Sequence, residues 1–176
     1  MQIKRELYLN QLIAGRKNGL IKIITGIRRC GKSYLLFTLF HGYLVSQGID
    51  ENHIIEIALD DRMNVSLRDP DAILHYIREQ IVDKELYYVL LDEVQLIPQF
   101  EEVLNSLLHV RNADVYVTGS NSRFLSSDII TEFRGRGDEI HLYPLSFSEF
   151  CEGYQGDRNK AWKEYYTYGG LPLVLT

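Results

Sequence analysis

Residues 21–33 have the sequence IKIITGIRRCGKS, an apolar stretch that leads into Gly26-x-x-x-x-Gly31-Lys32-Ser33. A glycine-rich loop of this kind exposes backbone N–H groups, which can hold the oxygens of a phosphate chain. The glycines let the backbone wrap closely, the lysine reaches the β- and γ-phosphates, and the serine hydroxyl binds Mg²⁺. The stretch therefore predicts a site for a nucleoside triphosphate. The alternative is an ordinary glycine turn between a strand and a helix.

The residues around this motif have the order that a phosphate loop requires. Apolar residues before the loop predict a strand, and apolar residues at helical spacing over 35–44 predict a helix after it. Between the two glycines, Arg28, Arg29 and Cys30 are expected to contribute mainly their backbone N–H groups. Tyr34 follows the motif directly and is assigned to the nucleotide site with it.

The composition is that of a folded globular protein. The 176 residues are 45% hydrophobic and 24% charged, which suits one domain with a substantial core. We see neither an apolar run long enough to cross a bilayer nor a signal-peptide core, so we expect a cytoplasmic protein without membrane contact. The two cysteines, Cys30 and Cys151, lie too far apart in sequence to predict a metal cluster or a disulfide framework.

The net charge of −5 is unevenly distributed along the chain. Residues 1–36 hold eight lysines and arginines against one glutamate, which gives +7 and leaves −12 for the rest. A positive region around a phosphate site raises the local concentration of anions. A nucleic-acid surface is the alternative, but we find no basic run interleaved with aromatic residues. The charges inside the loop favour the nucleotide.

A second stretch, YYVLLD at 87–92, is followed by Glu93. Its continuous apolar run predicts a strand that is buried on both faces, as in a parallel sheet. Two acids at the end of such a strand would be costly unless something pairs with them. We assign Asp92 to Mg²⁺, directly or through water, and Glu93 to orienting and deprotonating the attacking water. The alternative is that both acids cap the next turn.

The remaining chain alternates strands with helices. In the first helix, predicted over 3–15, we expect Lys4, Arg5 and Glu6 to be exposed and Leu7 to belong to the apolar face. With the two strands already described, further strands over 53–59, 114–118 and 139–143 make five. This order predicts a three-layer α/β sandwich around a mainly parallel five-stranded sheet, with the ligand at the carboxyl ends of the strands. The acid-bearing strand should lie beside the loop strand or one strand away.

Three later features are assigned to the site, each with an alternative. Ser120 and Asn121, at the end of the fourth strand, can contact the γ-phosphate or the attacking water, or else cap the helix that follows. Arg136, before the last strand, can act as an arginine finger on a neighbouring subunit's nucleotide, or remain a solvated loop arginine. The ending YYTYGGLPLVLT, residues 165–176, forms either a turn against the base or a buried structural corner.

Together GIRRCGKS, LLDEVQ, TGS, GRGDEIHLYPLSFSEF and YGGLP resemble the AAA-type predicted ATPases of bacteria and archaea, a branch of the P-loop NTPases. The resemblance covers nearly the whole chain and implies ATP hydrolysis with Mg²⁺. It implies phosphate and Mg²⁺ contacts for Lys32 and Ser33, Mg²⁺ for Asp92, the catalytic base for Glu93, and a sensor role for Ser120 or Asn121.

The resemblance extends to the last part of the chain. Arg136 matches a Gly-Arg ahead of the family's last strand, and Pro172 matches a Gly-Leu-Pro element that lies against adenine in related signalling ATPases. Adenine is also favoured because the guanine signature Asn-Lys-x-Asp is missing. Members of the family are about twice as long, so we expect 1–176 to be the ATPase domain without its C-terminal domain.

Two functional hypotheses follow from these patterns. In the first, the chain hydrolyses ATP and drives rearrangement of an attached domain or macromolecular partner, as a homo-oligomer if Arg136 acts in trans. The partner would be a nucleic acid or a protein bound through the C-terminal domain. In the second, the chain is a switch that holds ATP or ADP, hydrolyses slowly and signals through its conformation.

Overall fold

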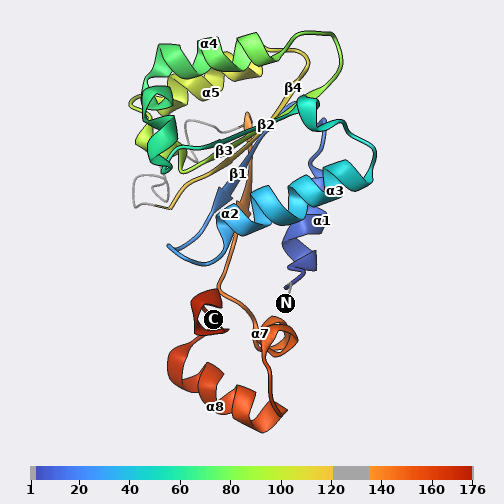
Figure 1. Ribbon diagram of the computed structural model, residues 1–176, viewed down its shortest axis with the longest axis vertical. Coiled ribbons are helices and arrows are strands. Elements are labelled where there is room, and N and C mark those ends of the chain that lie inside the picture. Colours follow the sequence, from blue (N-terminus) through green and yellow to red (C-terminus); the bar gives the residue numbers. More distant parts are fainter. Residues whose placement is uncertain (1–2, 121–134, 176) are drawn as a thin grey trace.

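The computed structural model describes residues 3–120 and 135–175, and its centre is a five-stranded sheet (Figure 1). The strand order is β2-β3-β4-β1-β5, and all neighbours are parallel. The strands are β1 (Ile21–Thr25), β2 (Ile54–Ala58), β3 (Tyr87–Asp92), β4 (Ala113–Thr118) and β5 (Gly137–His141). The loop strand β1 and the acid-bearing strand β3 are therefore separated only by β4, within the distance that the sequence predicted.

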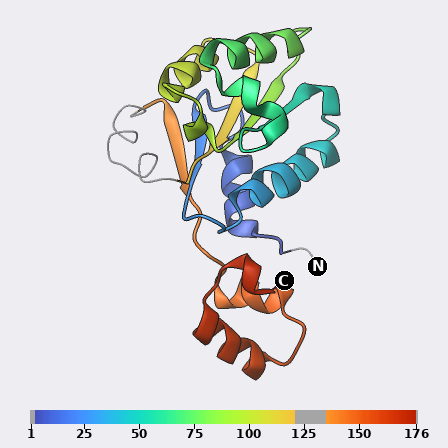
Figure 2. The same cartoon turned by 60° about the vertical axis from the view of Figure 1, so that its left-hand side comes forward.

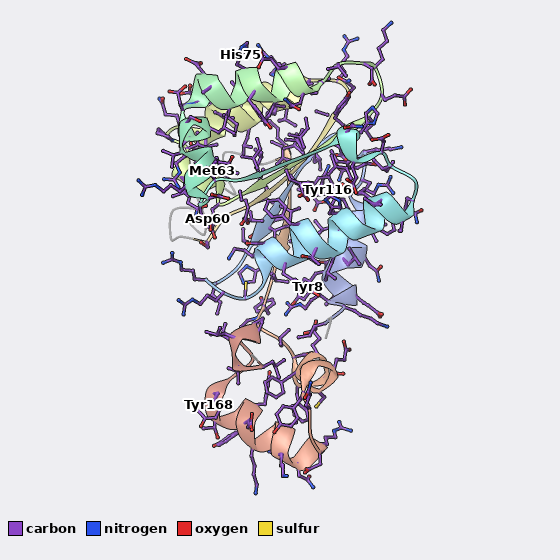
Figure 3. The ribbon with its side chains drawn as sticks, in the orientation of Figure 1. Tyr8, Asp60, Met63, His75, Tyr116 and Tyr168 are labelled. Carbon is purple, nitrogen blue, oxygen red and sulfur yellow. The ribbon has the colours of Figure 1, made fainter. Side chains whose placement is uncertain are left out.

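Helices cover both faces of the sheet, which confirms the three-layer prediction (Figures 1 and 2). On one face lie α4 (Pro70–Gln80) and α5 (Phe100–Leu108); on the other lie α1 (Glu6–Ala14), α2 (Lys32–Tyr34) and α3 (His41–Ser46). Because side chains alternate along a strand, Ile23 packs with α4 and α5, whereas Ile24 packs with the helices of the other face. Tyr8 and Tyr116, labelled in Figure 3, belong to the second of these cores.

The helix that follows the phosphate loop is continuous but changes pitch. It begins as α2, widens into a π-helical stretch over Leu35–Phe40, and continues as α3. Helix α4 begins as predicted, because the Asp69 carboxylate accepts a hydrogen bond from the Ala72 N–H at 2.9 Å and Pro70 occupies the first helical position. In the described residues, 3–120 and 135–175, no helix is long and apolar enough to cross a membrane.

A small helical lobe follows β5 and lies apart from the three layers (Figures 1 and 2). It consists of α7 (Phe147–Gly153), α8 (Arg158–Tyr168) and a 3₁₀ helix over Pro172–Leu175. Its own small core is built around Leu145, Phe150 and Ala161. Helix α7 begins with a capping box in which Ser146 and Glu149 hydrogen-bond each other's backbone N–H groups. The sequence predicted one helix entered at residues 144–147 and a turn or corner at the end of the chain, but neither α8 nor a separate lobe.

The first helix corrects two expectations about exposure. Arg5 was expected to be exposed, but it is only 3% exposed, because the helix begins at Glu6 and Arg5 lies before it in a left-handed conformation, φ 48°. Leu7 was expected on the apolar face, but it is 65% exposed. The buried side of the helix instead carries Tyr8 and Leu12, three and seven residues after Arg5.

Candidate nucleotide-binding site

The phosphate loop leaves the end of β1 through two glycines that other residues could hardly replace. Gly26 has φ 145°, and a Cβ there would lie 2.4 Å from the carbonyl oxygen of Leu142. Gly31 has φ 100° and opens α2. A side chain at Gly26 would clash with backbone, and at both positions it would force a strained conformation. The sequence therefore builds a tight loop against the end of β5.

The side chains of the loop take different positions. Arg28 and Arg29 are exposed, whereas Cys30 is buried in the core beneath the loop, where burial raises the pKa of its thiol. Lys32 is 4% exposed and folds back, so that its Nζ donates to the carbonyl oxygens of Gly26 at 3.1 Å and Ile27 at 3.0 Å. The predicted phosphate lysine thus lies against its own loop.

Asp92, at the end of β3, joins β4 and the start of α2 at the carboxyl edge of the sheet. The Ser33 hydroxyl donates to Asp92 Oδ2 at 2.7 Å, and the Thr118 hydroxyl donates to Asp92 Oδ1. The carboxylate is 2% exposed. Burial raises its pKa, the nearby negative charge of Glu93 adds to the rise, and the two hydroxyl hydrogen bonds oppose it. The structure thus brings together Ser33 and Asp92, which the sequence placed 59 residues apart.

Glu93 is fixed by both its backbone and its carboxylate. Its backbone has φ 57°, and its N–H donates to the Thr118 hydroxyl at 3.0 Å. The Ser120 hydroxyl lies 2.7 and 3.0 Å from the two carboxylate oxygens, and the Gln95 amide also donates to the carboxylate.

The Glu93 side chain makes no capping bond to the 3₁₀ helix that follows, so the capping alternative is wrong for it. Asn121, predicted beside Ser120, lies outside the described residues.

The donor atoms at this edge fit Mg²⁺. The Ser33 hydroxyl and the Asp92 carboxylate supply oxygen, the element that Mg²⁺ prefers. Within the described residues, no group of three or more histidine, cysteine or acidic side chains could hold a metal alone. That finding suits Mg²⁺, which keeps several waters and takes phosphate oxygens to complete its shell.

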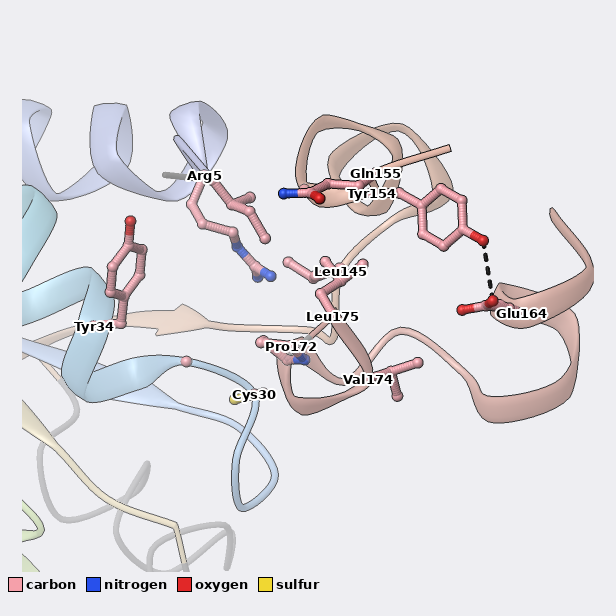
Figure 4. Close-up of a pocket in the computed structure, with 13 residues that line it drawn as sticks. Arg5, Cys30, Tyr34, Leu145, Tyr154, Gln155, Glu164, Pro172, Val174 and Leu175 are labelled. Atoms are coloured by element: carbon pink, nitrogen blue, oxygen red, sulfur yellow. Dashed lines mark hydrogen bonds between the residues drawn. The ribbon is translucent and has the colours of Figure 1, made fainter. Parts of the chain in front are cut away.

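A cavity of about 810 Å³ lies between the phosphate loop and the helical lobe (Figure 4). The loop and α2 contribute Cys30, Gly31 and Tyr34 to its wall, and the helical lobe contributes Pro172 among others. Pro172 lies close to the loop, because a Cβ on Gly31 would be 3.8 Å from its Cγ. The predicted site residues Tyr34 and Pro172 thus line one cavity, whose volume falls in the range of small-molecule sites.

Comparison of the sequence with known protein families finds a match. A family model described as an AAA domain matches residues 18–151. The chain belongs to the AAA domain family. Membership indicates a nucleotide-binding domain of the ATPase type, and the sandwich described above is its fold.

Two similar curated proteins are themselves uncharacterised. A protein of Haemophilus influenzae is 36% identical over 98% of this chain and 44% of its own length. A protein of Methanocaldococcus jannaschii is 28% identical over 88% of this chain and 36% of its own length. The chain thus spans less than half the length of these two relatives.

Solved structures share the fold at low sequence identity. AMPPCP-bound DnaA from Aquifex aeolicus has a TM-score of 0.63 and 14% identity over 99% of this chain and 59% of that one. The Saccharomyces cerevisiae Hsp104–ADP complex has a TM-score of 0.67 and 13% identity over 99% of this chain and 30% of that one. At these identities the similarity shows the fold.

Arg136 of this AAA domain lies at the opposite edge of the sheet from the phosphate loop. Its carbonyl accepts a hydrogen bond from the Ile21 N–H at 2.9 Å, at the start of β1, and its Nη1 donates to Asn105 Oδ1 at 2.8 Å. The five residues of β1 separate it from the loop by about 15 Å. Arg136 therefore does not reach the phosphate loop of its own chain.

Sequence reasoning missed three residues of the candidate site. Thr118 bridges Asp92 and the Glu93 N–H, and Gln95 holds the Glu93 carboxylate. A polar residue ending the buried β4 was a signal for Thr118. Arg5 lines the cavity, and nothing in the sequence distinguishes it from an exposed residue of a first helical turn.

Proposed function

We propose that this AAA domain binds ATP with Mg²⁺ and hydrolyses it to ADP and phosphate. The observation that carries the proposal is the 2.7 Å hydrogen bond between Ser33 and Asp92, because it joins the phosphate loop to the acid-bearing strand. Two oxygen-bearing side chains this close together could both hold one Mg²⁺ ion, directly or through water. Membership of the AAA domain family supports nucleotide binding by this domain.

The phosphates bind to the loop. Backbone N–H groups between Gly26 and Ser33 hold the phosphate oxygens, and Lys32 exchanges its two carbonyl partners for the β- and γ-phosphates. Ser33 and Asp92 hold Mg²⁺, which when bound offsets the negative charge that develops on the phosphate oxygens. A carboxylate as buried as Asp92 is suited to a cation, because burial without a positive partner is unfavourable for its charged form.

Glu93 is the base of the proposed reaction. The oxygen of water attacks the γ-phosphorus, the bond to the β–γ bridging oxygen breaks, and Glu93 accepts the proton that the water loses. The Ser120 hydroxyl and the Gln95 amide fix the direction of its carboxylate. A carboxylate has about four acceptor positions, so two donors leave room for the water.

The base of the nucleotide binds in the cavity beside the loop. Pro172 offers an apolar surface within contact distance of Gly31, which suits the flat face of a purine. The cavity lies between the loop and the helical lobe, so a bound nucleotide contacts both (Figure 4). Exchange of ATP for ADP can therefore change the position of the lobe and of any partner attached to it.

The test compares phosphate release by the wild type with release by Glu93→Gln. The amide keeps the size of the side chain but accepts a proton poorly, so we expect kcat to fall by about 10²- to 10⁴-fold while ATP binding persists. Glu102→Gln, the same change at an exposed position of α5, is the matched control and should leave kcat unchanged. Equal rates in Glu93→Gln and the wild type would exclude Glu93 as the base.

A slow nucleotide-dependent switch is the second candidate. It is favoured by the contacts of Lys32 with its own loop, because Lys32 must give up these two carbonyl partners before it can reach the phosphates. A switch should co-purify with ATP or ADP and release phosphate no faster when DNA or protein partners are added. Nucleotide-free protein with steady multiple turnover would favour the enzyme.

A further inference from the structure

Arg5 lines the cavity beside the phosphate loop, and the proposed reaction leaves it without a role. Three contacts hold its guanidinium in place. Nη2 donates to the carbonyl oxygen of Tyr143 at 2.6 Å, the group lies 4.7 Å from the centre of the Tyr8 ring, and Nε lies 3.3 Å from Glu149 Oε1. The side chain is thereby fixed between the core of the domain and the helical lobe.

These contacts leave the donors of Arg5 incompletely used. Nη1 has no hydrogen-bond partner among residues 3–120 and 135–175, and Nε faces Glu149 without the alignment of a hydrogen bond. Arginine carries five N–H donors, and buried polar groups are nearly always paired. Figure 4 shows the guanidinium pointing among Leu145, Leu175 and Pro172. A buried, unpaired donor that faces a cavity indicates that a ligand supplies the acceptor.

The walls of the cavity indicate the chemistry of this ligand. Many of them are apolar, formed by Ile3, Leu145, Pro172, Val174 and Leu175. Glu149 offsets the charge of Arg5, and Glu164 also lines the cavity. Apolar walls and a balanced charge disfavour a phosphate group. They suit a flat, uncharged heterocycle with acceptor nitrogens, and such a ring is attached to the phosphates of any nucleotide on the loop.

We propose that Arg5 recognises the base of the bound nucleotide by donating a hydrogen bond from Nη1 to a ring nitrogen of a purine. This assignment rests on the proposed nucleotide site and adds a residue that selects the base. Arg5 also touches Tyr143 and Glu149. Tyr143 lies in the segment that leads from β5 into the lobe, and Glu149 lies in α7 of the lobe, so the base contacts the lobe through Arg5 as well as through Pro172.

The first experiment separates base recognition from phosphate binding. Binding of Mg²⁺–ATP and of Mg²⁺–tripolyphosphate, which has no base, is measured by calorimetry for the wild type and for Arg5→Met. Methionine keeps much of the apolar stem but cannot donate. We expect a loss of about tenfold or more in ATP affinity, as for one buried charge-assisted hydrogen bond, and tripolyphosphate affinity within twofold of the wild type. Arg78→Met, the same change at an exposed position of α4, should alter neither.

A second experiment has a readout that a purely structural role of Arg5 would not change. ATP is compared with its 1-deaza, 3-deaza and 7-deaza analogues, each of which lacks one ring nitrogen. In the wild type, one analogue should bind several-fold more weakly than ATP; in Arg5→Met, that analogue and ATP should bind equally. If Arg5→Met does not fold, Arg5→Lys takes its place, because one ammonium cannot serve Tyr143, Glu149 and a base together.

The outcomes distinguish the two proposals. Unchanged ATP affinity in the Arg5 variant, an equal loss for ATP and tripolyphosphate, or an analogue penalty that persists in the variant would each overturn base recognition by Arg5. None of these results would affect the phosphate loop. The proposed nucleotide site itself fails if the wild type binds neither ligand, or if Lys32→Ala binds both as the wild type does.

Discussion

Charged groups are buried at both the amino edge of the sheet, where the strands begin, and the carboxyl edge, where they end. The two edges differ in whether opposite charges are paired. At the amino edge, Lys22 on β1 is fully buried and paired with Asp114 on β4. The lysine also donates to the Leu20 carbonyl at 2.7 Å and lies 4.6 Å from the centre of the Tyr116 ring. Asp114 accepts further hydrogen bonds from the Tyr116 hydroxyl and the Lys17 N–H, each at 3.0 Å. This cluster is complete without a ligand.

At the carboxyl edge, the charges stay apart. Asp92 accepts hydrogen bonds only from neutral hydroxyls among the described residues, and Lys32 donates to the carbonyls of its own loop. Positive φ does not separate the two edges, because it occurs at Arg29 and Glu93 here and at Lys17 beside Asp114 at the amino edge. What marks the carboxyl edge as prepared for a ligand is a buried acid without a cation and a buried cation without an acid.

The comparison predicts that the amino edge maintains the fold. Lys22→Met should lower the free energy of unfolding by about 3–5 kcal/mol, because it leaves the Asp114 carboxylate buried without its partner. Denaturant titration measures the loss. Asp114→Asn in the same chain should restore part of the stability by removing the unpaired charge. If Lys22→Met lowers stability as expected but Asp114→Asn restores none of it, the ion-pair explanation is contradicted.

The matching prediction for the carboxyl edge concerns binding. Lys32→Ala should weaken ATP binding by about 100-fold, or about 2.7 kcal/mol, because the phosphates lose their charged donor. Its stability should fall by less than that of Lys22→Met, since the change leaves loop carbonyls without a donor but no buried charge without its partner. Calorimetry and denaturant titration on the same sample test both statements. Unchanged ATP affinity would exclude the phosphate loop as the nucleotide site.

The sequence predicted those features of each edge that depend on residues close together in the chain, and it missed those that depend on residues far apart in the chain. Strand β3 and the phosphate loop were predicted closely, because an apolar run and a glycine pattern are local. The meeting of Ser33 and Asp92 was also predictable, since the carboxyl ends of neighbouring parallel strands share an edge. The partner of Lys22 lies 92 residues away, and the carbonyl that fixes Arg5 lies 138 residues away. No local pattern reports such pairings.

Substitution of Asp92 should change stability less than Lys22→Met does, and in the opposite direction. Burial raises its pKa in the folded protein, so its charged form costs stability above the pKa of the unfolded chain, about 4. Asp92→Asn should therefore stabilise the nucleotide-free protein by about 1 kcal/mol at pH 7 and lose Mg²⁺-dependent ATP binding. Below about pH 4 both side chains are neutral, and the gain should vanish. Thermal melts at pH 7 and pH 4 measure it; a gain that is the same at both would contradict the pKa explanation.

Arg136 should show the smallest effect, because it lies at the amino edge but outside the paired cluster. Within residues 3–120 and 135–175 its side chain hydrogen-bonds Asn105 at the surface, so Arg136→Ala should change stability by less than about 0.5 kcal/mol. ATP affinity should not change either, since the side chain does not reach its own phosphate loop. If it acts in a neighbouring subunit, the specific turnover of the wild type should rise with protein concentration, whereas that of Arg136→Ala should stay flat. If the specific turnover of the wild type and of Arg136→Ala depends equally on protein concentration, Arg136 does not act on a neighbouring subunit's nucleotide.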